Sequence, residues 1–207
     1  MADEETRQKA TVQDDIREAQ IASHCGLQRT GKRLGPDAFD DEQNPFELKS
    51  ATKSGVTTGR DIGIHSIKAY RKVYWVIAEG TNYRTSSGAK SFEINSLYIA
   101  HPEDLEPWFS KIESRIRYEL EKCERVLTAA EASGVDAETI QFCRDKLARG
   151  VTINNPKIPM HLIRQNATQL NSKDSREAQQ QLRQFVQSRP LRKDPYAAPS
   201  VESELPE

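Results

Sequence analysis

Two acidic residues and one lysine stand at positions where they can form a magnesium-dependent hydrolytic site. Asp37 lies ten residues before Glu47, and Lys49 follows Glu47 after a single residue. The segment 46–49 alternates apolar and charged side chains, which is typical of a β-strand. The side chains of Glu47 and Lys49 should therefore lie on one face of that strand, and Asp37 joins them if it ends a neighbouring hairpin strand.

Such a cluster has a defined chemistry. Two carboxylates about 4 Å apart repel each other by about 4 kcal/mol at an effective dielectric of 20, so they are unfavourable alone and favourable around a cation. Mg²⁺ prefers oxygen ligands, which Asp37, Glu47 and the backbone carbonyl of Leu48 would supply. Lys49 would hold or deprotonate the attacking water and stabilise charge on a phosphate. Taken alone, the pattern fits the ordinary alternative better, which is an ion pair on the face of a strand.

The positive charge is concentrated in one part of the chain. The whole chain has 207 residues, with 30 basic and 31 acidic ones, so a basic coat over the entire protein is excluded. Positions 49 to 90 contain eight basic residues but only two acidic ones, Asp61 and Glu79. This local excess fits either a solvated face or a surface that binds a polyanion. The basic residues are Lys49, Lys53, Arg60, Lys68, Arg71, Lys72, Arg84 and Lys90.

Periodicity predicts the elements that must position these residues. Helical spacing is present over 11–25, and the apolar run 73–78 predicts a central strand buried on both faces. A second strand is expected over 92–99. A long amphipathic helix should begin at 101–103, and after Ser133-Gly134 a second helix capped by Asp136 should complete a helical hairpin. Because Cys123 and Cys143 lie on the apolar stripes of these two helices, we expect them to be buried.

Composition excludes several classes of protein. No run of 18 apolar residues is present, so we expect no membrane span, and the acidic start of the chain does not fit a signal peptide. The three cysteines are odd in number and have no CxxC spacing, so we expect no disulfide framework and no zinc site. This cysteine usage favours a location in the reducing cytoplasm. Beyond residue 167 the chain is polar; a weak helix is expected near 177–186 and disorder in the last twenty residues.

Four short motifs, taken together, resemble the PvuII family of restriction endonucleases, of the PD-(D/E)xK nuclease superfamily. They occur in the family's order, and the distance from the aspartate to the Glu-x-Lys is the same. The resemblance covers about residues 12–165, and its most specific piece is the last motif, because no rule of secondary structure requires it. The motifs are Gly35-Pro36-Asp37-Ala38-Phe39-Asp40, Glu47-Leu48-Lys49-Ser50, Tyr70-Arg71-Lys72-Val73-Tyr74-Trp75 and Asn154-Asn155-Pro156-Lys157-Ile158-Pro159.

The resemblance implies a fold and a division of the chain. The fold would be of the α/β (α+β) class, with a restriction-endonuclease-like core, a mixed central sheet flanked by helices and the helical hairpin as an insertion. An N-terminal helix at 1–26 would serve dimerisation, and the nuclease core would span 27–165 with the hairpin near 111–150. Residues 166–207 would form a polar, partly disordered tail.

The resemblance also implies an activity: type II restriction, with Mg²⁺-dependent cleavage of double-stranded DNA at a short palindrome by a homodimer. A companion DNA methyltransferase would protect the host. By position, Asp37 and Glu47 correspond to the metal ligands, Lys49 to the catalytic lysine and Tyr70 to a tyrosine near the scissile phosphate.

DNA-reading residues are implied in the same way. Asn154 and Asn155 correspond to residues that read adenine in the major groove, for which an amide is suited; a simple turn is the alternative. Residues that we expect to contact DNA without a base assignment are Asp14, Thr57 and Lys157.

One stretch departs from the family, which has a run of histidines where this chain has 57–61. Arg60 can donate two hydrogen bonds to guanine and Asp61 can accept from cytosine, so the recognition sequence should differ. Alternatively, Arg60 contacts phosphate or pairs with Asp61. Two other functions stay open at this point: a structure-specific or repair nuclease on the same core, and a non-catalytic DNA-binding or helical scaffold protein.

Overall fold

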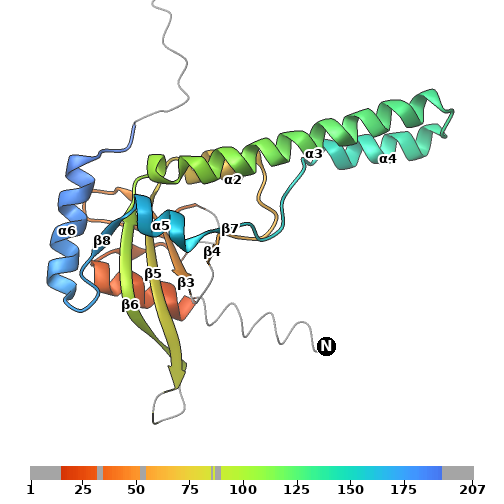
Figure 1. Cartoon of the computed structure of the whole chain (residues 1–207). Coiled ribbons are helices and arrows are strands. Elements are labelled where there is room, and N and C mark those ends of the chain that lie inside the picture. The colour runs from red at the N-terminus through yellow and green to blue at the C-terminus, as the bar shows by residue number, and fades with distance from the viewer. Residues whose placement is uncertain (1–14, 32–34, 52–54, 85, 87–89, 193–207) are drawn as a thin grey trace, which may run out of the picture.

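A single mixed sheet forms the centre of the protein, and helices cover both of its faces (Figure 1). The structure, a computed structural model, describes residues 15–31, 35–51, 55–84, 86 and 90–192. Its strands are β1 (Gln28–Arg29), β2 (Ala38–Phe39), β3 (Pro45–Ala51), β4 (Val56–Thr57), β5 (Tyr74–Arg84), β6 (Lys90–Ala100), β7 (Lys157–Ile158) and β8 (Thr168–Leu170). Its helical elements are an N-terminal helix through residues 15–25, α2 (Ile64–Tyr70), the 3₁₀ turn η1 (Pro102–Leu105), α3 (Glu106–Ala132), α4 (Ala137–Ala148), α5 (Met160–Asn166) and α6 (Ser175–Ser188).

The strand order confirms the predicted α+β class with a mixed sheet. It runs β1-β2-β3-β5-β6-β8, with β4 paired to both β3 and β7. Strands β3 and β5 are parallel, whereas the other neighbours are antiparallel. Parallel neighbours need a crossover connection, and here β4 and α2 lie within that connection.

Strand β5 is buried on both faces, as its apolar run predicts. Tyr74, Val76 and Ala78 point to a core layer that also contains residues of the N-terminal helix and α6. Trp75 and Ile77 point to the other layer, which contains residues of α2, α3 and α5. The alternation of side chains along a strand thus joins two apolar layers through one central strand.

The polar C-terminal segment is part of the core, contrary to the prediction of a tail after residue 165. Strand β8 pairs with β6, and α6 packs against the sheet. The weak helix expected near 177–186 is confirmed and is longer. Its apolar residues recur at helical spacing among many glutamines and arginines, so mean composition hides an amphipathic face. The buried residues of α6 are Ala178, Leu182, Phe185 and Val186. Residues 193–207, most of the stretch predicted to be disordered, lie outside the described residues.

The helical hairpin forms as predicted, with Asp136 accepting a hydrogen bond from the Thr139 amide at the start of α4. Helix α3 is buried against the body as far as Ile116 and then projects beyond it together with α4 (Figure 1).

The prediction that Cys123 and Cys143 are buried is wrong, since both are exposed. In the projecting part, α3 and α4 pack against each other away from the sheet (Figure 1). One side of their apolar stripes therefore stays open as a groove of about 480 Å³.

All three cysteines are free thiols. Within the described ranges, no helix is long and apolar enough to cross a membrane.

Candidate active site at the edge of β3

The structure brings Asp37, Glu47 and Lys49 together. The Lys49 Nζ lies 2.7 Å from Glu47 Oε1 and 3.3 Å from Asp37 Oδ2. Glu47 and Lys49 share a face of β3 because every second side chain of a strand points to the same face. The predicted convergence of these three side chains is thus present in the fold.

Backbone hydrogen bonds fix Asp37 beside β3. The Asp37 amide donates to the Phe46 carbonyl at 2.9 Å, and the Asp37 carbonyl accepts from the Thr30 amide at 2.9 Å. The Leu48 amide donates to Asp37 Oδ2 at 2.8 Å. Asp37 is therefore held by Thr30, just after β1, on one side and by β3 on the other, which leaves little freedom for its carboxylate.

The electrostatics of the cluster keep Lys49 charged. Burial alone would lower the pKa of the Lys49 ammonium, but the carboxylates of Glu47 and Asp37 outweigh it and raise the pKa. Burial raises the pKa of Glu47, and the neighbouring Asp37 adds to that effect while Lys49 opposes it. The two carboxylates thus have one buried cation between them, which offsets their mutual repulsion.

The donor set of this cluster fits magnesium. No group of three or more His, Cys, Asp or Glu side chains suited to a metal is found among the residues that the structure describes. Mg²⁺ does not need such a cage, because it commonly takes one or two carboxylates and completes its octahedron with waters and substrate phosphate. The carboxylates of Asp37 and Glu47 provide that minimum. The Leu48 carbonyl stays a predicted further ligand.

A cavity of about 560 Å³ opens beside Lys49 and reaches the segments predicted to read DNA. Thr57, Arg60, Asn155 and Lys157 line it together with Lys49. Asp61 and Asn154 are exposed in the same two segments but are not part of the lining. Asp14 lies outside the described residues. The cavity therefore joins most of the predicted reading residues to the predicted catalytic lysine.

The two reading segments are paired with each other. Strand β4 pairs with β7 through Val56–Ile158 and Thr57–Lys157, and an isolated bridge joins Ile62 to Ile153. The turns between these contacts place Asp61 and Asn155 in left-handed backbone conformations, with φ of 52° and 45°. Within the described part of the chain, Arg60 and Asp61 do not form the alternative ion pair. Their side chains are exposed and remain available to a ligand.

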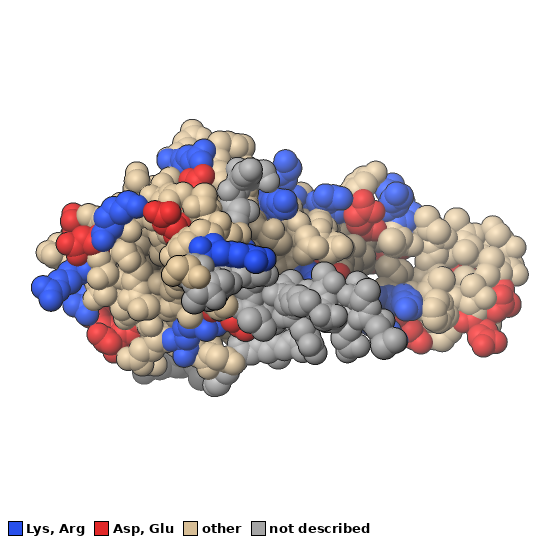
Figure 2. All heavy atoms as spheres, turned by 90° about the horizontal axis from the view of Figure 1, so that it is seen from below, with Lys and Arg blue, Asp and Glu red and all other residues tan. Residues whose placement is uncertain are grey.

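Basic residues on the face seen in Figure 2 are interspersed with acidic ones and do not form one continuous patch. This agrees with the near-neutral net charge of −1. Basic side chains do gather locally where Arg17, Lys49, Arg60 and Lys157 line the cavity, which Glu18 also lines.

Tyr70, at the end of α2, lies next to this site. Its hydroxyl donates to the Thr58 carbonyl at 3.0 Å, and its ring packs edge-on against Trp75 with centroids 4.9 Å apart. Burial, and after it the charge of Glu47, raises the pKa of Tyr70 to about 12. Tyr70 is therefore a neutral hydrogen-bonding group at neutral pH.

Glu18 is a residue of this site that the sequence analysis missed. It lies on the N-terminal helix and lines the same cavity, and Arg29 Nη2 approaches its Oε2 at 3.4 Å. Burial, and secondly the charge of Asp37, raises the pKa of Glu18 to about 7. The sequence predicts that Glu18 lies within helix 11–25. Which side of that helix adjoins the site depends on how the helix packs against the sheet.

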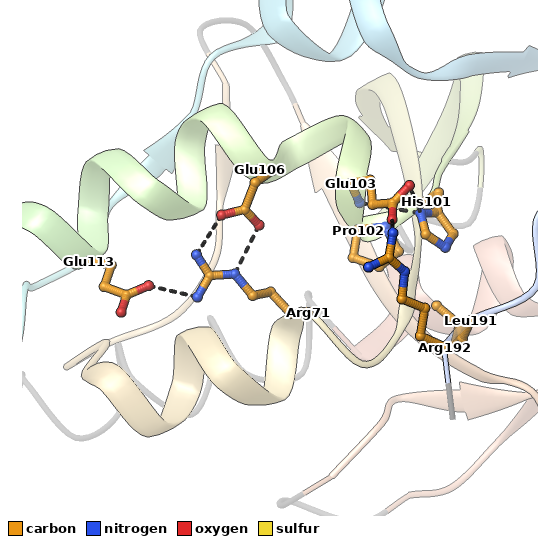
Figure 3. Close-up of a pocket in the computed structure, with 8 residues that line it drawn as sticks. All are labelled: Arg71, His101, Pro102, Glu103, Glu106, Glu113, Leu191 and Arg192. Carbon is orange, nitrogen blue, oxygen red and sulfur yellow. Dashed lines mark hydrogen bonds and ion pairs between the residues drawn. The ribbon is translucent and has the colours of Figure 1, made fainter. Parts of the chain in front are cut away.

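A second pocket, of about 280 Å³, surrounds an ion-pair network that joins α2 to α3 (Figure 3). Arg71 donates to the two carboxylate oxygens of Glu106 at 2.9 and 2.6 Å and to Glu113 at 2.7 Å. Hydrogen bonds from Arg71 are the largest cause that lowers the pKa of both glutamates. With its charges paired internally, this network ties the end of α2 to the body.

Comparison with known protein families agrees with this geometry. A family model described as restriction endonuclease PvuII matches residues 5–125, which include Asp37, Glu47, Lys49 and Tyr70. The fold and its site therefore define a nuclease of the restriction-endonuclease-like class. The chain belongs to the PvuII restriction endonuclease family, which confirms the resemblance drawn from the motifs. The turn at 154–157 lies beyond the matched residues, and no curated protein matches the chain.

Proposed function

We propose that the protein is a type II restriction endonuclease that hydrolyses double-stranded DNA at a short palindromic site in the presence of Mg²⁺. The observation that carries this proposal is the cluster of Asp37, Glu47 and Lys49 at the edge of the cavity that the reading segments line. Membership of the family supports a DNA substrate.

The chain's own residues have separate tasks in the proposed reaction. Asp37 and Glu47 would hold Mg²⁺, which would increase the acidity of water and offset the charge of the phosphate. Lys49 donates hydrogen bonds to the attacking water and to the scissile phosphate as negative charge develops on it. Tyr70 lies beside that phosphate, with its hydroxyl hydrogen-bonded to the Thr58 carbonyl. Cleavage leaves 5′-phosphate and 3′-hydroxyl ends.

Base reading falls to the two paired segments. Asn154 and Asn155 offer both an acceptor and donors to the N7/N6 edge of adenine, Arg60 donates to guanine and Asp61 accepts from cytosine. Thr57 and Lys157 contact the backbone and position the duplex. Asp14 stays a predicted DNA contact.

Cleavage of both strands at a palindrome requires two copies of the site, so we propose a homodimer with a two-fold axis. In the same proposal the N-terminal helix serves dimerisation, the enzyme acts in the cytoplasm, and a companion methyltransferase protects the host DNA. Blunt ends are implied by family resemblance.

Incubation with plasmid DNA tests the activity. With Mg²⁺ we expect a limited set of discrete fragments, and with EDTA in place of Mg²⁺ no cleavage. Sequencing the fragment ends then gives the recognition site and the stagger of the cut. A smear, or nicks confined to junctions, would favour a repair nuclease instead, and DNA binding without cleavage would favour a non-catalytic protein.

Asn154→Ala tests the reading turn. We expect a loss of discrimination of about 1–3 kcal/mol at one base pair of the mapped site, because one amide no longer pairs with a base edge. Salt-sensitive binding to unrelated DNA should stay nearly unchanged, since it depends on phosphate contacts. Asn154 is the better position for this test, because Asn155 has a left-handed backbone in which alanine would add strain.

Cleavage rates on duplexes with the mapped site, and with each single base-pair change, measure this effect. Asn95→Ala, at an exposed position on β6 outside the cavity lining, serves as the control. If Asn154→Ala discriminates as well as the control does, the proposed role of the turn is wrong.

A further inference from the structure

Thr58 is a buried polar residue at the point where the two reading segments meet. Its side chain and backbone are 4% exposed. Its hydroxyl donates to the Pro156 carbonyl at 2.9 Å, and its amide lies 3.4 Å from the same oxygen. Pro156 directly follows Asn155, so one carbonyl of the 154–157 turn is held from two atoms of the 57–61 segment.

The carbonyl of Thr58 makes a third contact, in the opposite direction. It accepts the hydrogen bond of the Tyr70 hydroxyl at 3.0 Å. The next residue, Gly59, is so close to Tyr70 that an added Cβ would lie 3.4 Å from the hydroxyl oxygen. The loop and the tyrosine are thus in close contact over two successive residues.

Tyr70 in turn is fixed next to the catalytic cluster. Its ring packs on Trp75, and the Trp75 indole N–H donates to the Tyr70 carbonyl at 3.1 Å. Trp75 is the register partner of Glu47 in the parallel pair of β3 and β5. Three hydrogen bonds and one ring contact therefore lead from the turn that carries Asn155 to the strand that neighbours Glu47.

We propose that Thr58 is a positioning residue that couples base reading to cleavage, a role that rests on the proposed function. Binding of the correct bases would fix the 57–61 and 154–157 segments relative to each other. This fixes the position of the Thr58 carbonyl, which in turn orients the Tyr70 side chain beside the scissile phosphate. A wrong base displaces one segment, and the displacement reaches Tyr70 through the shared carbonyls.

Thr58→Val removes the hydroxyl at nearly constant shape and is the direct test. We expect the ratio of cleavage rates between the mapped site and sites with one changed base pair to fall about tenfold, because the Pro156 carbonyl loses a buried donor. The fall should come from slower cleavage of the mapped site. Binding to that site, measured with Ca²⁺ in place of Mg²⁺, should change less than cleavage does.

Three further measurements separate coupling from a general structural role. Thr58→Ser keeps the hydroxyl and should restore the wild-type ratio. Thr128→Val, which removes a hydroxyl that donates to Glu124 within α3, should leave the ratio unchanged. In Thr58→Val, hydrogen exchange at the β7 amides should accelerate, while the thermal unfolding midpoint of the whole protein stays within a few degrees.

The outcomes are distinct. If wild-type protein cuts at a defined site and Thr58→Val lowers the rates on all duplexes equally, or changes none, the coupling role is wrong and the proposed function stands. If wild-type protein cuts no DNA in Mg²⁺, the proposed function fails, and the coupling role fails with it.

Discussion

Alanine at position 49 is expected to slow DNA cleavage by about 10²–10³-fold, the usual cost of removing one donor that stabilises developing negative charge. Lys49 forms ion pairs with both Glu47 and Asp37, so the variant also removes the positive charge that offsets the repulsion between these two carboxylates. Single-turnover cleavage of a duplex with the mapped site, at saturating enzyme, measures the chemical step separately from binding.

Two controls make this result interpretable. Lys68→Ala removes an exposed lysine of α2 from the same basic stretch and should cleave like wild type. Lys49→Met keeps the apolar stem but lacks the charge and should be as slow as the alanine variant. Cleavage by Lys49→Ala at the rate of Lys68→Ala would place the chemistry elsewhere.

Phe185→Ala is expected to lower the free energy of unfolding by about 3–5 kcal/mol, the range for an aromatic residue deleted from a core. Phe185 is 7% exposed and packs edge-on against Tyr74 of β5, with ring centroids 6.3 Å apart. The large loss follows only if α6 belongs to the folded core. Urea unfolding followed by circular dichroism gives the difference directly.

Arg183→Ala, at an exposed position two residues earlier in α6, is the matched control and should change stability by less than about 0.5 kcal/mol. Equal and small effects of both variants would mean that α6 is detached in solution. The polar segment would then be the tail that its composition suggests.

The part of the site that could be predicted from the sequence is the part set by local geometry. The alternation along 46–49 placed Glu47 and Lys49 on one face without knowledge of the fold. The position of Asp37 needed one further condition, a hairpin between its strand and β3, and the structure meets it. The family motifs supplied the same three residues independently.

The contributions that escaped prediction depend on packing between distant segments. Ile21, Ala22 and Cys25 follow Glu18 by three, four and seven positions, so Glu18 lies on the side of its helix that packs toward the sheet. No local pattern predicts that this side adjoins the cavity. Thr58 donates a hydrogen bond to the Pro156 carbonyl, 98 positions later in the sequence. Neither relation has a signature in spacing or composition.

Composition also misled in two opposite directions. The glutamine-rich stretch of α6 suggested only a weak helix within a polar tail, yet four well-spaced apolar residues bury one face of it against the core. The apolar stripes of α3 and α4 looked like core, yet they extend past the body that would cover them. A periodic pattern predicts which side of a helix is apolar, but only the tertiary arrangement determines whether a partner covers it.

The hairpin of α3 and α4 leaves and re-enters the body at two anchored points. At its base, the Trp108 indole N–H donates to the Lys157 carbonyl at 2.9 Å, and Ile153 is bridged to Ile62. Its far end, at Ser133 and Gly134, touches neither anchor (Figure 1). The module can therefore vary in length by whole helical turns during evolution, and its tip is a natural place to graft a tag or a fused domain without altering the catalytic edge.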